Sequence, residues 1–201
     1  MPFLGTTGGG SVKQYGGQAN LGYFIKNSLR FRAANTSNLS RSHSASDRQK
    51  WTFSFWVKRG RLDTDRIIGV SGTGSEGYIG FVGDAIYAID FDGATTYWNL
   101  FTNAVFRDPA AWYHIVLALD TTQATSSNRV KLYVNGSLMT SFQAEAYPTQ
   151  NYQGYYNSAV TTYIGRRGYD TNNTLDGYLA EFNFIDGQQL TPSSFGKTDA
   201  A

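Results

Sequence analysis

Carboxylates are the side chains of this 201-residue chain with the most obvious catalytic chemistry. Hydrolysis of a glycosidic bond needs two of them across a sugar ring, one as an acid and one as a nucleophile or base. Asp90 and Asp92 lie two residues apart and would share a strand face, but Asp92 also begins an Asp-Gly turn. The three glutamates, Glu76, Glu145 and Glu181, have no aspartate two residues further on. We therefore predict that the chain is not an enzyme, and we assign no catalytic residue.

The histidines give no better case for nucleophilic catalysis. His114 lies in an alternating run, on the face opposite the large apolar residues, and His43 lies between two serines in a polar stretch. Cysteine is absent from the sequence, which excludes disulfides and thiolate metal sites. The glycine-rich stretch at 71–77 lacks the Gly-Lys-Ser/Thr and the following helix of a phosphate-binding loop.

Aromatic rings beside amides and carboxylates are the groups that commonly bind sugars, and the segment after residue 145 supplies them. The candidate binding residues are Tyr152, Tyr155, Tyr156, Tyr169, Asp170 and Asn172. Tyrosine-rich loops serve protein interfaces equally well, because tyrosine gives rigid amphipathic contact area at low entropic cost. The residues thus predict an exposed binding surface for a carbohydrate or for another protein.

Calcium is the metal that the sequence could accommodate, because hard oxygen ligands occur in several loops. The candidate ligands are Asp120, Asn128 and Asp170. The simpler alternative is that these side chains bond to backbone amides in turns. Without a cluster of several acids, any such site would be weak, with a Kd of about 10⁻⁴–10⁻³ M. No cofactor is required.

Three consecutive strand-like runs between residues 112 and 142 indicate the architecture that must position these groups. Large apolar residues occupy every second position of residues 113–119, and the alternation resumes at 130–134. Asn135-Gly136 then separates this run from residues 138–142. Asn-Gly between two alternating runs predicts a type I′ hairpin turn, because both central positions need positive φ.

Further alternating runs predict an all-β protein with less than about a tenth of its residues in helices. The additional strands are expected at residues 28–32, 51–58, 67–70, 78–82, 85–91, 95–101 and 178–185, with loops at 35–50 and 145–163. A β-bulge is expected near Ala180-Glu181, because Leu179 and Phe182 are three residues apart yet both look like core residues. The predicted core comprises Trp51, Phe53, Phe55, Ile115, Leu117, Leu132, Val134 and Phe182.

Several short motifs resemble the concanavalin A-like, laminin-G-type jelly roll. They are Trp-Tyr-His-Ile-Val at 112–116, Val-Lys-Leu-Tyr-Val-Asn-Gly at 130–136, Tyr-Ile-Gly-Arg at 163–166 and Leu-Asp-Gly-Tyr-Leu-Ala-Glu-Phe at 175–182. The resemblance covers residues 28–195 and implies a two-sheet antiparallel sandwich that often binds carbohydrate and sometimes calcium. The Gly-rich start, Ser-Leu-Arg-Phe at 28–31 and Leu-Thr-Pro-Ser-Ser-Phe-Gly-Lys-Thr-Asp-Ala at 190–200 resemble modules of tailed-bacteriophage virion proteins.

Residues 1–27 are expected to form a separate N-terminal arm before a jelly-roll domain at 28–201. The arm holds seven glycines, and residues 1–46 carry five basic and no acidic side chains, a net charge of +5. Its scattered apolar residues cannot offset a backbone entropy cost of about 1–2 kcal/mol per residue. We therefore expect the arm to become ordered on a larger assembly, with Lys13 and Lys26 as docking residues.

These observations favour a lectin-like virion module that adheres to a surface or binds a host glycan. The alternative is a decoration or cement protein that binds other virion subunits and no sugar, and a glycoside hydrolase is the least favoured function. A homo-oligomer within the particle is expected. The net charge of only +2 does not suggest nucleic acid, and no apolar run approaches about 18 residues, so no membrane insertion is expected. The start lacks signal-peptide features, so synthesis in a host cytoplasm is predicted.

Overall fold

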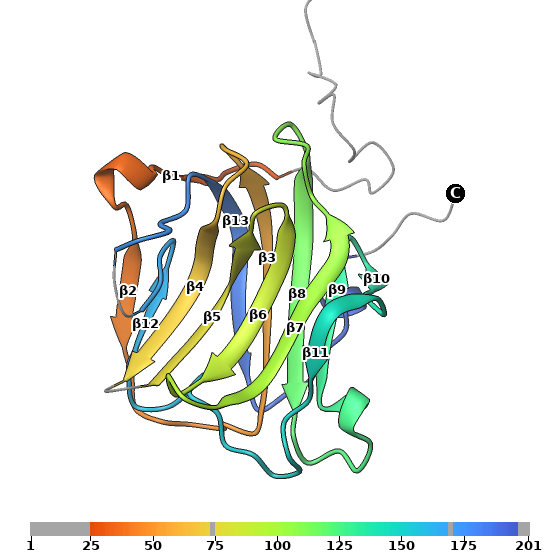
Figure 1. Cartoon of the computed structure of the whole chain (residues 1–201). Helices are drawn as coiled ribbons and strands as arrows, with labels where there is room; N and C mark the ends of the chain where they lie inside the picture. The colour runs from red at the N-terminus through yellow and green to blue at the C-terminus, as the bar shows by residue number, and fades with distance from the viewer. Residues whose placement is uncertain (1–24, 73–74, 169–170, 197–201) are drawn as a thin grey trace, which may run out of the picture.

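The computed structural model describes residues 25–72, 75–168 and 171–196. Of these residues 51% lie in strands and 5% in helices, which confirms the predicted all-β class. Two antiparallel sheets lie face to face as a sandwich (Figure 1). Within the described residues, no helix is long and apolar enough to cross a membrane.

The first sheet has six strands with the two longest apolar runs at its centre. In spatial order its strands are β1 (Leu29–Phe31), β13 (Gly177–Asp186), β3 (Lys50–Arg59), β8 (Trp112–Asp120), β9 (Val130–Val134) and β10 (Ser137–Leu138). Asn135 and Gly136 have φ values of 49° and 82°, which confirms the predicted tight turn between β9 and β10. β8 is buried along its whole length because both of its faces are covered.

The second sheet has seven strands and contains the predicted meander. In spatial order they are β11 (Phe142–Ala146), β7 (Thr96–Val105), β6 (Ala85–Phe91), β5 (Ser75–Val82), β4 (Asp65–Gly72), β12 (Thr161–Ile164) and β2 (Leu39–Ser42). Three short 3₁₀ helices complete the described secondary structure: η1 (Ala33–Asn35), η2 (Ser126–Asn128) and η3 (Pro192–Ser194).

The core between the sheets is apolar and largely as predicted. Phe55, Ile115 and Leu117 are fully buried there, and Trp51 is 1% exposed. Phe182 is only partly buried, although it packs against the same core. Outer-face residues of the six-stranded sheet form a second, smaller cluster around Trp56, Trp112 and Ala180. β3 therefore has large apolar side chains on both faces, as its sequence indicates.

The predicted bulge in β13 is confirmed and determines where two phenylalanines point. The β3–β13 register shifts between Ala180 and Asn183, and Glu181 has a φ of 48°. The extra residue changes the side-chain alternation. As a result Phe182 and Phe184 both contact the inward-facing Phe53, with ring centroids 6.0 Å and 4.6 Å away.

Two predicted loops contain strands. β2 lies inside the expected loop 35–50, and β12 begins inside the expected loop 145–163 and ends one residue after it. β12 pairs with both β2 and β4, so it is an internal strand of the sheet. Both segments lack alternating hydrophobicity, because β2 is exposed throughout and β12 is only half-buried. Their strand structure comes from backbone pairing and not from a core-facing pattern.

Candidate functional site

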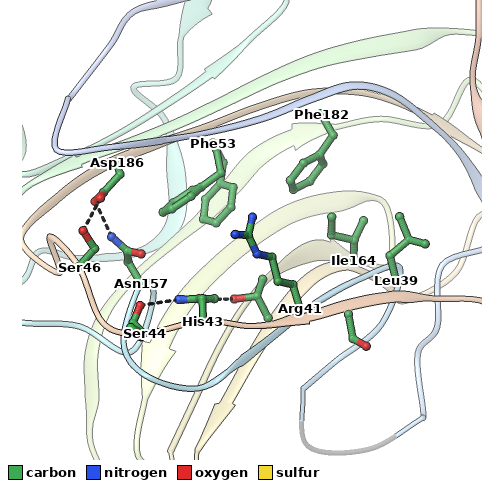
Figure 2. A pocket seen from close by; sticks show the side chains of 13 residues that line it. Leu39, Arg41, His43, Ser44, Ser46, Phe53, Asn157, Ile164, Phe182 and Asp186 are labelled. Atoms are coloured by element: carbon green, nitrogen blue, oxygen red, sulfur yellow. Dashed lines mark hydrogen bonds between the residues drawn. The ribbon is translucent and has the colours of Figure 1, made fainter.

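A pocket of about 620 Å³ opens between the two sheets where their edges separate (Figure 2). β2 and β12 form one wall, and the part of β13 beyond its bulge forms the other. The lining residues are Leu39, Ser40, Arg41, His43, Ser44, Ser46, Phe53, Asn157, Thr162, Ile164, Phe182, Phe184 and Asp186. Its volume falls within the range of about 300–1,000 Å³ that is usual for small-molecule sites.

Three phenylalanines make one wall of the pocket aromatic. Phe53 anchors them because it is 3% exposed and belongs to the core. Phe182 also stacks on the buried Phe55, with ring centroids 5.6 Å apart and an interplanar angle of 15°. Phe184 is 36% exposed, so its ring remains available to a ligand. An aromatic wall fixed from behind by the core provides a firm surface for the apolar face of a ring.

Hydrogen bonds fix polar groups on both sides of the pocket. His43 Nδ1 lies 3.0 Å from the Ser44 carbonyl oxygen, and Nε2 lies 3.1 Å from Thr162 Oγ1. A carbonyl can only accept, so Nδ1 carries the proton in that hydrogen bond. Asn157 donates to Asp186 Oδ1 at 2.6 Å, and Ser46 donates to the other carboxylate oxygen. The imidazole and the carboxylate therefore lie at defined positions on the rim (Figure 2).

Arg41 is the cation of the pocket. It lies on β2, and its guanidinium points toward the rings of Phe53 and Phe182 (Figure 2). In contrast to the Asp186 carboxylate, it forms no ion pair or side-chain hydrogen bond within the described part of the chain. Its five N–H donors are thus available to a bound molecule.

The tyrosines predicted to bind sugar do not form one exposed platform. Tyr156 is fully buried, and its hydroxyl donates to the Ile89 carbonyl at 3.1 Å. Its ring lies 5.0 Å from that of Trp51, inside the core. The prediction of Tyr156 as an exposed binding residue is therefore wrong, because the loop before β12 folds inward to close the end of the sandwich. Tyr152 and Tyr155 are half-buried.

The remaining candidates are either distant from these tyrosines or not described. Asn172 is exposed in the connection from β12 to β13, next to Asn173, whose carbonyl accepts from the Arg66 backbone on β4. Tyr152 lies beside β7 instead, because its ring stacks on Tyr97 at 4.9 Å. Tyr169 and Asp170 lie outside the described residues. None of the described candidates lines the pocket.

Of the three calcium candidates, Asp120 is engaged by other protein groups. Asp120 is buried, accepts from the Thr122 hydroxyl at 2.6 Å, and lies 3.3 Å from Lys50 Nζ. Asn128 ends the 3₁₀ helix η2. Among the residues that the structure describes, no three acidic or histidine side chains form a group that could hold a metal ion. Asp170 lies outside that part of the chain, and calcium binding stays a prediction.

The arm predicted at residues 1–27 lies mostly outside the described residues, including Lys13. Lys26 is described and exposed. Ile25 is partly buried against the outer-face cluster of Trp56, Trp112 and Ala180. The folded part of the chain thus begins at or before residue 25, and docking by the lysines stays a prediction.

Asp90 and Asp92 do not form a catalytic pair. Asp92 begins the turn, as favoured from the sequence, because β6 ends at Phe91 and the Asp92 carboxylate accepts from the Thr95 backbone N–H. Asp90 is fully buried and accepts from the Tyr155 backbone N–H at 3.0 Å. Burial raises the pKa of Asp90 to about 7, because the charged carboxylate is poorly solvated there. Asp90 is therefore a structural group that holds the loop before β12.

Replacing Asp90 by asparagine is expected to stabilise the fold at alkaline pH. A carboxyl with a raised folded-state pKa is protonated in the native state while the unfolded chain has already lost its proton. Its contribution to the free energy of unfolding therefore falls between the ordinary pKa near 4 and the folded value of about 7. Asparagine keeps the acceptor for Tyr155 and cannot ionise. Asp90→Asn should be close to the parent at pH 4 and exceed it by about 4 kcal/mol at pH 8, because each unit of pKa difference corresponds to about 1.4 kcal/mol.

Urea unfolding of the parent and the variant at pH 4, 6 and 8 checks this expectation. Asp63→Asn is the matched control, because the Asp63 side chain is 66% exposed. It removes the same charge at an exposed position, so the comparison isolates the effect of burial at Asp90. If the free energies of unfolding of Asp90→Asn and of the parent changed with pH in the same way, Asp90 would ionise normally in the folded protein.

Sequence reasoning found only two residues of the pocket, Phe53 and Phe182, and assigned both to the core. The polar stretch around His43 gave no sign of a site, but His43 directly follows β2 and is half-buried against Thr162. One signal could have revealed the site. Phe182 and Phe184 lie two residues apart at the predicted bulge and just after it, so the end of this strand carries two aromatic side chains on one face.

Two antiparallel sheets packed as a sandwich, with a ligand-sized pocket between them, define a jelly-roll module. Residues 26–194 match the family described as the concanavalin A-like lectin/glucanases superfamily. This match spans most of the chain, and the chain belongs to that superfamily. No curated protein matches it in sequence.

Solved structures share the fold at low sequence identity. A heptameric SAP-like pentraxin from Limulus polyphemus has a TM-score of 0.57 and 13% identity, over 81% of this chain and 75% of that one. Domains LG4-5 of the mouse laminin alpha1 chain have a TM-score of 0.60 and 11% sequence identity, over 85% of this chain and 44% of that one. Domain 4 of AbnA, a GH43 arabinanase from Geobacillus stearothermophilus, was solved in complex with arabinotriose. It has a TM-score of 0.51 and 16% sequence identity, over 79% of this chain and 68% of that one. At these identities the similarity shows the fold alone.

Proposed function

We propose that this chain is a non-enzymatic, lectin-like module that binds a glycan in the pocket between β2, β12 and β13 and acts on the surface of a bacteriophage particle. The observation that carries the proposal is the aromatic wall of Phe53, Phe182 and Phe184 facing a rim of fixed polar groups. Sugars bind where the apolar face of a ring meets an aromatic side chain and the hydroxyls meet amides, hydroxyls and charges. The virion placement rests on the resemblance of the chain's two ends to phage modules.

The distribution of carboxylates supports binding without hydrolysis. Asp186 is the only carboxylate among the described residues that line the pocket, whereas glycoside hydrolysis uses two. Glu76 is paired with Arg167, and Asp90 is buried elsewhere. A related fold with a bound sugar also supports the proposal, because domain 4 of AbnA has been solved in complex with arabinotriose.

Phe184→Ala is expected to weaken glycan binding at least about tenfold with little effect on folding. The ring is 36% exposed, so its loss removes ligand contact more than core packing. The measurement is a glycan array that includes bacterial surface polysaccharides, followed by affinity titration of the best binder. Leu138→Ala is the control, since Leu138 is 46% exposed on β10, at the opposite edge of the same sheet. Unchanged affinity in Phe184→Ala would place the sugar elsewhere, and the absence of any bound glycan would refute the function.

A decoration or cement protein is the second candidate. Leu29 and Leu39 are 48% and 51% exposed and line a smaller cavity of about 350 Å³ with Asn27 and Ser28, beside the start of the described chain. Exposed apolar side chains at one site suit a protein partner.

Removing residues 1–24 tests this second candidate. If the arm serves only to attach the module to a partner, the unfolding midpoint should stay unchanged while incorporation into assembled particles is lost. Incorporation that survives the deletion would place the attachment on the sandwich. A deletion that unfolds the domain would make the arm part of the fold.

A further inference from the structure

Charge is distributed unevenly within the pocket. Its charged or titratable lining residues are Arg41 and His43 on the β2 side and Asp186 at the far end. The Asp186 carboxylate already accepts from Asn157 and from the Asp47 backbone N–H at 3.2 Å. The Arg41 guanidinium has no such partner within the described chain. The pocket therefore offers an uncompensated positive charge at one end and a satisfied negative charge at the other.

A cation with this geometry favours one chemical group in the ligand. A guanidinium presents two parallel N–H donors that match a carboxylate, and such a charge-assisted pair is stronger than a neutral hydrogen bond. Arg41 is exposed in the unbound chain, so the ligand itself would have to exclude water from this pair when its ring lies against the phenylalanines. A carboxylate at the other end would meet repulsion from Asp186. The orientation of a bound acid is thus fixed by both ends of the pocket.

We infer, on the basis of the proposed function, that the pocket selects an acidic sugar, a pyranose ring that carries a carboxylate. The carboxylate pairs with Arg41, and the apolar face of the ring lies against Phe184 and Phe182. Ring hydroxyls reach Thr162 and Asn157 on the rim. A neutral sugar can make the ring and hydroxyl contacts but leaves Arg41 unpaired, so the structure assigns to Arg41 the discrimination between acidic and neutral glycans.

The two histidines of the chain provide a direct readout of this inference. His43 lies in the pocket wall, and His114 is 8% exposed on the outer face of the other sheet, where its ring stacks on Trp56 at 4.8 Å. In the isotope-labelled full chain at constant pH, NMR signals of the two rings can be followed together. The probes are the methyl glycosides of glucuronic, galacturonic and N-acetylneuraminic acid, and the neutral methyl glucoside and galactoside.

At least one acidic probe is expected to shift the His43 signals and leave those of His114 in place, with a Kd at least about tenfold lower than that of the neutral probes. Which acid binds tightest distinguishes a uronic acid from a sialic acid. Arg41→Gln should remove the preference while weak neutral binding persists. Arg32→Gln is the matched control, because Arg32 is exposed, lies outside the pocket lining and, like Arg41, has no side-chain partner in the described part of the chain. It should bind like the parent, and all three proteins should unfold at the same midpoint.

Each other result overturns the inference in a recognisable way. Equal shifts of His43 by acidic and neutral probes would refute acid selection and leave the lectin function intact. A preference for acids that survives Arg41→Gln would remove Arg41 as its cause. Equal shifts at His43 and His114 would indicate a general ionic effect. No shift at His43 with any probe, together with glycan binding on an array, would refute this site but not the function, whereas no binding in either assay would refute both.

Discussion

Replacing Arg59 by methionine is expected to lower the free energy of unfolding by about 3–5 kcal/mol. The Arg59 side chain is completely buried at the end of β3. It donates to the carbonyls of Phe106 and Gly83 at 2.8 Å and of Asp63 at 2.9 Å, and its Nη1 lies 3.5 Å from Asp84 Oδ1. Methionine fills a similar volume but leaves those acceptors without a donor, and an unsatisfied buried acceptor costs about 1–3 kcal/mol.

The guanidinium of Arg59 also lies 4.3 Å from the centroid of the Phe81 ring. Burial lowers the pKa of Arg59, and the nearby Asp84 opposes that effect. Lysine would restore the charge without the planar fork of donors, so Arg59→Lys should recover only part of the lost stability.

Arg107→Ala is the control for Arg59→Met. Arg107 Nε donates to the same Asp84 carboxylate at 2.7 Å, but its side chain is 66% exposed. Exposed ion pairs contribute little because water and salt screen them. In guanidinium chloride unfolding, the loss of free energy of unfolding should be largest for Arg59→Met, smaller for Arg59→Lys and smallest for Arg107→Ala. A methionine variant as stable as the alanine control would mean that the acceptors around Arg59 find water instead.

Replacing Phe55 by alanine is expected to cost a similar amount, about 3–5 kcal/mol. Phe55 is completely buried on β3, and its ring stacks on Phe182. Removing it leaves a cavity between the two sheets that the neighbouring strands cannot fill, because β3 is held by β13 on one side and β8 on the other. Leu117→Ala, at another fully buried position, should cost about 2–5 kcal/mol.

Equilibrium unfolding of Phe55→Ala against Leu138→Ala checks this prediction, since Leu138 is 46% exposed. Because Phe182 is both the partner of Phe55 and a wall of the pocket, the same substitution should also weaken glycan binding. An unfolding midpoint no lower than that of Leu138→Ala would mean that the inward face of β3 is misassigned. If Phe55→Ala lowered stability but left glycan binding unchanged, the packing of Phe55 against Phe182 would not be needed to hold the pocket wall.

The sequence by itself determined the class of fold and most of the core. Strands that bury one face against the other sheet must alternate apolar and polar residues. This alternation appears in residues 113–119 and 130–134, and it also predicted which side chains of β3 face the core. The Asn135-Gly136 turn and the bulge at Glu181 were also predicted from the sequence. Each requires a local backbone conformation that few residue patterns satisfy.

Only the tertiary structure decided where the candidate site lies. Its groups come from residues 39–46, 157–164 and 182–186, which are distant in sequence and meet because β12 pairs with β2 while the β13 bulge turns two phenylalanines toward them. β2 faces the pocket and solvent instead of the core, so burial imposes no alternating pattern on it. Tyr156 shows the converse: its loop looks polar, yet the ring is buried because the end of the sandwich had to be closed. The alternation of apolar and polar residues along a strand reflects which of its side chains are buried. A site between sheet edges depends instead on contacts between strands that no short stretch of sequence specifies.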